Sequence, residues 1–184
     1  MNIILIHGNG GCTADMHWYI YLEKKLTARG FPVVRKTLPD NQVAHESVWI
    51  PFIRDQLGAS KDSILVGHSS GAIAAMRYAE QYPLAGMVLV SAYVSDLGEP
   101  NEKAGGWFDR PWQWEAMGNH VPWVIQFASV DDPWIPIDEA RWVRSHLHTE
   151  YYEYTDRGHF IGDRETTVFP ELVEALESKL LSQP

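Results

Sequence analysis

The sequence predicts an α/β fold with a doubly wound, mostly parallel central sheet of about six strands flanked by helices, a three-layer sandwich. Apolar runs of strand length alternate with segments of helical period along most of the chain. The runs at 3–6 and 87–90 are apolar at every position, which is typical of strands covered on both faces. The 184 residues, 45% hydrophobic and 21% charged, favour a single domain spanning 1–184.

The individual elements follow from the period of each apolar run. The predicted strands are residues 2–6, 31–35, 63–66, 87–91, 124–129 and 151–154. The predicted helices are residues 16–28, 48–57, 72–82, 138–147 and 170–181. Strand and helix therefore alternate, as a parallel sheet requires.

Residues 94–119 interrupt this alternation with a mixture of glycine, proline, acidic and aromatic residues. Excursions of this length often form lids or binding elements, although their aromatic side chains more often pack over apolar surface. Trp107 and Trp112 in this segment, together with Trp134 further on, are candidate substrate contacts. The sequence does not decide between binding and packing for them.

Charge and composition argue against several classes of partner. The formal net charge is -9, and lysine and arginine are not clustered, so neither nucleic acid nor an anionic membrane is an expected partner. No apolar run approaches the roughly 18 residues of a membrane span, and the first residues do not resemble a signal peptide. Cys12 is the single cysteine, which excludes an intrachain disulfide. We therefore expect a cytoplasmic protein without metal or cofactor.

A nucleophile motif lies between a predicted strand and a predicted helix. Gly67-His68-Ser69-Ser70-Gly71 matches G-x-S-x-G, in which glycines permit a turn too tight for side chains and expose the central serine at the sheet edge. Backbone N–H groups at the start of the following helix favour a developing oxyanion. Ser69 is the predicted nucleophile, because Ser70 lies one residue outside the glycine frame.

A serine nucleophile needs a base and an acid, which this fold supplies later in the chain in the order acid, then histidine. Asp131 and Asp132 follow the strand at 124–129, and His159 follows the strand at 151–154. Loops that leave the carboxyl ends of parallel strands converge on one crevice, so the three loops can meet. Strand periodicity alone leaves the choice between the two adjacent aspartates open.

The first strand is followed by a glycine-rich turn at residues 8–11. A dinucleotide-binding G-x-G-x-x-G frame fails here, because Thr13 occupies the third glycine position and no acid follows the second strand. The turn fits better as half of an oxyanion hole. Either Asn9 or Gly10 would then donate its backbone N–H together with that of Ser70.

The chain resembles the retinoblastoma-binding protein 9 family of small serine hydrolases, within the α/β-hydrolases. The resemblance runs end to end and rests on these segments: 8–11, 67–78, 91–93, 96–98, 110–114, 131–133 and 158–160. It implies a catalytic triad of Ser69, Asp132 and His159, and it therefore favours Asp132 over Asp131. An L-x-C-x-E sequence for a retinoblastoma-type partner is absent, so that interaction is not carried over.

These observations predict a serine hydrolase that cleaves a small ester, thioester or amide, aminoacyl derivatives included, through a covalent acyl-enzyme. The expected partner is a small acyl substrate. The alternative is a protein-interaction module on a hydrolase scaffold with little catalytic activity, since a fold does not fix a function.

Overall fold

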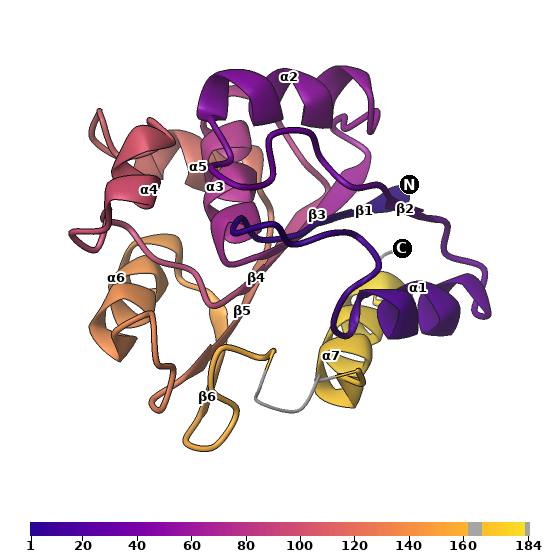
Figure 1. Ribbon diagram of the computed structural model, residues 1–184. Helices are drawn as coiled ribbons and strands as arrows, with labels where there is room; N and C mark the ends of the chain where they lie inside the picture. The colour runs from indigo at the N-terminus through magenta and orange to yellow at the C-terminus, as the bar shows by residue number, and fades with distance from the viewer. Residues whose placement is uncertain (162–166, 183–184) are drawn as a thin grey trace.

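The computed structural model describes residues 1–161 and 167–182 (Figure 1). Across these residues the sheet has six strands in the order β2-β1-β3-β4-β5-β6, and every neighbouring pair is parallel. The predicted α/β architecture is confirmed, with a sheet that is parallel throughout. The strands are β1 (Asn2–Ile6), β2 (Val33–Arg35), β3 (Ser63–His68), β4 (Gly86–Val90), β5 (Val124–Ser129) and β6 (Glu150–Tyr154).

Seven helices lie within the described residues, two more than the sequence pattern indicated. They are α1 (Tyr19–Thr27), α2 (Glu46–Asp55), α3 (Ser70–Gln81), α4 (Pro100–Ala104), α5 (Trp114–His120), α6 (Ile137–Leu147) and α7 (Pro170–Leu181). The additional helices, α4 and α5, lie in the excursion and have only 5 and 7 residues, too few to show a helical period. None of the described helices combines the length and the apolar character needed to cross a membrane.

Alternate residues of strands β1, β3, β4 and β5 face two separate apolar cores. Ile3 and Leu5 of β1 belong to the core that is completed by α1 and α7. Ile4 and Ile6 belong to the core that is completed by α2 and α3 on the other face. Figure 1 shows α1 and α7 side by side on one side of the sheet and α2 with α3 on the other. The three layers follow from this alternation.

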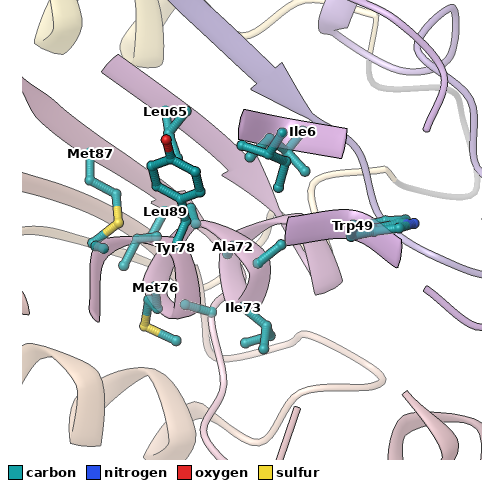
Figure 2. Close-up of a cluster of buried hydrophobic side chains, with 14 of the residues drawn as sticks. Ile6, Trp49, Leu65, Ala72, Ile73, Met76, Tyr78, Met87 and Leu89 are labelled. Atoms are coloured by element: carbon teal, nitrogen blue, oxygen red, sulfur yellow. The ribbon is translucent and has the colours of Figure 1, made fainter. Parts of the chain in front are cut away.

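Helix α3 is the most deeply buried helix of the second core, because every residue from Ser70 to Glu80 is buried. Figure 2 shows Met76 and Tyr78 of this helix in the same cluster of buried hydrophobic side chains as Leu65 and Leu89 of the strands. A helix this deeply packed is fixed on several sides. The turn at its N-terminus is therefore held by the core rather than by solvent-exposed contacts.

Buried Arg77 attaches the excursion to α3. Its guanidinium donates to the carbonyl of Trp107 at 2.9 Å, lies 3.7 Å from the ring centre of Trp112 and pairs with Glu80 at 2.7 Å. The side chains of Arg77 and Glu80 are 0% and 3% exposed. A buried charge is tolerated only when such partners compensate its lost hydration. The excursion is consequently packed against the domain.

The glycines of the G-x-S-x-G motif stand where backbone segments touch. A Cβ atom on Gly67 would overlap the carbonyl of Gly71, and one on Gly71 would overlap the carbonyl of Ile6. The neighbouring atoms are backbone and cannot swing aside. The sharp turn from β3 into α3 thus depends on glycine at both positions.

We predict that Gly71→Ala lowers the free energy of unfolding by about 2 kcal/mol or more, since overpacking against backbone has no side chain to relax. Gly118→Ala is the matched control, because it lies in α5 with no atom within 4 Å of an added Cβ. It should be neutral or stabilising by up to about 1 kcal/mol. Urea unfolding monitored by circular dichroism measures both. Equal stability of the two variants would contradict the tight contact.

Candidate active site

Ser69 occupies the turn between β3 and α3 in a strained backbone conformation, with φ 56° and ψ -124°. Left-handed φ values are disfavoured for residues with a Cβ, and they persist where the surrounding structure holds them. Its N–H donates to the carbonyl of Val90 at 2.9 Å, which ties the turn to the end of β4. The hydroxyl is thereby presented at the carboxyl edge of the sheet.

A cavity of about 620 Å³ lies at this edge and brings together loops from five strands. Among its lining residues are Asn9 after β1, Ser69 after β3, Tyr93 after β4, Trp134 after β5 and His159 after β6. The strands are all parallel, so their carboxyl ends meet here. The order β2-β1-β3 also makes this the point where the chain changes direction across the sheet.

His159 lines this cavity and is paired with Asp132. The ring Nδ1 donates to Asp132 Oδ2 at 2.7 Å, and the two side chains are 6% and 3% exposed. The other carboxylate oxygen, Oδ1, accepts from the N–H groups of Trp134 and Ile135, each at 3.0 Å. The Trp134 ring lies edge-on to His159 at 4.8 Å. Asp132 therefore fixes the ring so that Nε2 is the nitrogen left for other partners.

The charge of Asp132 survives its burial. Loss of hydration raises the pKa of this carboxyl, but the hydrogen bond and attraction of His159, with the two backbone N–H groups, outweigh it. The pKa of Asp132 accordingly lies below its ordinary value. An ionised carboxylate beside His159 stabilises the imidazolium form of that ring.

Asp131 occupies a different position from its neighbour. Its Oδ1 accepts from the Gly158 N–H at 2.9 Å and from the Ser129 hydroxyl. The Ser129 hydrogen bond is the main reason that the pKa of Asp131 is lowered. Asp131 thus holds the loop of His159 from the exposed side, whereas Asp132 contacts the imidazole itself.

The glycine-rich turn after β1 lies against the serine. A Cβ on Gly8 would come 3.3 Å from the Ser69 Cβ, so the two backbones are neighbours. The Gly10 N–H donates to the carbonyl of Gln42 at 3.1 Å, which favours Asn9 of the two sequence candidates. Ser70 is the first residue of α3, where helical N–H groups have no intrahelical acceptor. Asn9 and Ser70 are the N–H donors that this geometry favours.

The three tryptophans predicted as substrate contacts have different positions. Trp134 lines the cavity. Trp107 is 1% exposed and donates to the carbonyl of Ala44, and Trp112 donates to the carbonyl of Val94 and packs on Arg77. Neither Trp107 nor Trp112 is therefore among the residues that line this cavity. Their indole N–H groups and ring faces are used inside the protein.

Glu102 of α4 is a cavity residue that the sequence pattern did not indicate. Its carboxylate accepts from the Asn9 side-chain amide at 2.6 Å and from the Tyr93 hydroxyl at 2.5 Å. Glu99 also lines the cavity, and none of the lining residues that the structure describes is lysine or arginine. The position of Tyr93 directly after β4 was a usable signal, but Glu102 lies in a helix too short to predict. The cavity is consequently acidic.

No cluster of three or more histidine, cysteine, aspartate or glutamate side chains suited to a metal ion occurs in the described ranges 1–161 and 167–182. Hydrogen bonds join His159 to Asp132, and Glu102 to Asn9 and Tyr93.

Comparisons with known proteins found relatives in sequence and in fold. A family model described as serine hydrolase matches residues 3–178. Serine hydrolase RBBP9 of Rattus norvegicus is 45% identical over 179 residues, covering 96% of this chain and 94% of the relative. The YdeN protein of Bacillus subtilis (strain 168) is 27% identical over 184 residues, with coverages of 96% and 94%. The crystal structure of the B. subtilis ydeN gene product superposes with a TM-score of 0.90 at 22% identity, covering 98% of this chain and 99% of that one.

We predict that the His159 Nδ1 proton gives a low-field NMR signal that exchanges slowly, because a buried carboxylate holds it. Asp132→Asn should remove that signal. Asp131→Asn is the matched control and should retain it, since Asp131 bonds the loop backbone instead. Loss of the signal in Asp131→Asn alone would show that the two aspartates are assigned in reverse.

Proposed function

The chain belongs to the serine hydrolase family, and on that premise we propose that it cleaves small esters, thioesters or amides, aminoacyl derivatives included, through a triad of Ser69, His159 and Asp132. The observation that carries the proposal is the 2.7 Å hydrogen bond from His159 Nδ1 to buried Asp132, in the same cavity as Ser69. A serine at a strained strand-to-helix turn is otherwise a weak nucleophile and needs such a base.

In the first half-reaction, Nε2 of His159 takes the proton of the Ser69 hydroxyl while the serine oxygen attacks the substrate carbonyl carbon. The electron pair of the carbonyl moves onto its oxygen. Asp132 accepts a hydrogen bond from the Nδ1–H group and stabilises the imidazolium that forms. The leaving group then departs with the proton from Nε2, and the acyl group stays on Ser69.

The backbone N–H groups of Ser70 and Asn9 are the proposed donors to the oxyanion. The N-terminal end of α3 adds the positive end of its dipole at the same place. Gly10 is not included among these donors, because its N–H donates to the carbonyl of Gln42.

In the second half-reaction, a water molecule activated by His159 attacks the acyl-enzyme and releases the carboxylic acid.

The alternative, an interaction module with little catalytic activity, has to account for the buried Asp132–His159 pair. Burial of a carboxylate has a cost in hydration that a purely structural contact can avoid with apolar side chains. The cavity beside this pair supports a small-molecule substrate rather than a protein partner. Labelling by an active-site probe separates the two functions.

The charge of the cavity supports a preference among substrates. Glu99 and Glu102 line it without a compensating lysine or arginine among the described lining residues. Carboxylates at short range stabilise a cationic group and destabilise an anionic one. Neutral or cationic acyl substrates are therefore the proposed class.

We predict that Ser69→Ala abolishes labelling by a fluorophosphonate probe and lowers kcat on p-nitrophenyl acetate by roughly 10³-fold or more. Ser70→Ala is the matched control and should keep most of both activities, because its hydroxyl bonds Tyr93 rather than lining the cavity. A folded wild-type protein that fails to label would support the interaction module instead.

We further predict that an ester ending in a trimethylammonium group has a kcat/KM roughly ten-fold or more above that of the same ester ending in a carboxylate, because the cavity is acidic. Glu99→Gln should narrow this ratio, and Glu115→Gln should not, because Glu115 is an exposed carboxylate on α5 outside the cavity lining. Kinetics at low ionic strength measure the ratios. Equal rates for both esters would contradict the charge preference.

A further inference from the structure

His68, the residue before the proposed nucleophile, makes contacts that the turn itself does not require. The turn needs glycine at 67 and 71, whereas position 68 is free in the G-x-S-x-G pattern. The His68 side chain is nevertheless buried, with 2% of the residue exposed. Its Nε2 lies 2.9 Å from the backbone carbonyl oxygen of His159, and its Nδ1 lies 2.7 Å from the Tyr19 hydroxyl.

These two contacts fix where the protons of the His68 ring lie. A carbonyl oxygen can only accept, so Nε2 of His68 carries the proton and donates it to His159. Burial, with the nearby His159, keeps the pKa of His68 well below its ordinary value and the ring neutral. In a neutral ring the other nitrogen, Nδ1, has a lone pair and must accept. The Tyr19 hydroxyl is therefore the donor to it.

Tyr19 is suited to hold this tautomer. It is fully buried on α1, and burial raises the pKa of its hydroxyl well above the ordinary value, so the O–H proton is retained. The Sγ atom of Cys12 lies 3.8 Å from the same hydroxyl. One direction of donation thus runs from Tyr19 through His68 to the His159 carbonyl.

The backbone on either side of His159 adopts conformations that neighbouring residues have to stabilise. Gly158 and Phe160, on either side of it, both have left-handed φ values of 51° and 59°. Such a conformation in Phe160 is strained and persists only where neighbours hold it. Asp131 holds the loop through the Gly158 N–H on the exposed side, and His68 holds it through the carbonyl on the buried side.

We propose that His68 is a positioning residue for the reaction, which fixes the backbone of His159 through its Nε2–H while Tyr19 fixes the His68 tautomer. This inference rests on the proposed function, in which His159 is the base. The ring of His159 must lie within hydrogen-bond distance of the Ser69 hydroxyl, about 3 Å, and a misplacement of about 1 Å can cost around 10²-fold in rate. In this role His68 acts on kcat through the backbone of His159.

The first test compares His68→Gln with His68→Leu by steady-state kinetics on p-nitrophenyl acetate. Glutamine carries an N–H that can still reach the His159 carbonyl, whereas leucine has no donor. His68→Leu should lower kcat by about 10²-fold with little change in KM, and His68→Gln should stay within about ten-fold of wild type. Equal kcat in the two variants would overturn the proposal, and so would a raised KM in His68→Leu with kcat unchanged.

The second test removes a hydroxyl without disturbing packing. Tyr19→Phe should lower kcat several-fold. The ¹⁵N NMR resonance of the unprotonated His68 Nδ1 should also shift, because that nitrogen loses its hydrogen-bond donor. Tyr78→Phe is the matched control, because its buried hydroxyl donates at 2.9 Å to the Ala59 carbonyl and neither residue lines the cavity. Its kcat should be unchanged. Equal loss of kcat in both variants would show that Tyr19 acts only through stability.

A double-mutant cycle separates positioning from general destabilisation. In the His159→Ala background the ring to be positioned is gone, so His68→Leu should have no further effect on the residual rate. A further loss of the same size as in wild type would overturn the proposal. Failure of the proposed hydrolase function gives a different result from failure of the positioning role. In that case the fluorophosphonate probe would label wild type no more than it labels Ser69→Ala.

Discussion

The contact between backbones at the start of α3 is the constraint on which the rest of the site depends. Gly71 lies against the carbonyl of Ile6, and Gly67 lies against Gly71, with no room for a Cβ at either position. Strands β1 and β3 and helix α3 are therefore held at backbone contact distance, and Ser69 between them takes a left-handed φ of 56°. The buried environment of α3 fixes this point in space, and the other loops are placed relative to it.

Hydrogen bonds position those loops, in addition to apolar packing by Ile135 and Phe160. The Asp132 carboxylate accepts hydrogen bonds from the imidazole of His159 and from two backbone N–H groups, so its charge is stabilised although the side chain is buried. Asp131 and His68 hold the two sides of the same loop through the Gly158 N–H and the His159 carbonyl. Polar contacts have directions that apolar contacts lack, which suits a site in which a ring must face one hydroxyl.

The excursion between β4 and β5 contributes a carboxylate to the site, which its aromatic-rich composition did not indicate. Its tryptophans pack over Arg77 and the apolar core, where they fasten the segment to α3. What it presents to the cavity is the carboxylate of Glu102, held by Asn9 and Tyr93. An aromatic-rich segment thus makes an acidic wall, and the aromatic cavity residue Trp134 comes from the loop after β5 instead.

The sequence by itself determined the α/β alternation, the bounds of β1, β5 and α7, and the glycine-framed position of Ser69, because periodicity and turn chemistry are local properties. Resemblance to a family indicated Asp132, but its orientation depends on the N–H groups of Trp134 and Ile135. Only the tertiary structure decided that Trp107 is buried, that Glu102 reaches Asn9 across 93 positions, and that His68 reaches His159 across 91. Such contacts exist only once parallel strands bring their carboxyl ends to one edge, and no local pattern in the chain encodes which side chains meet there.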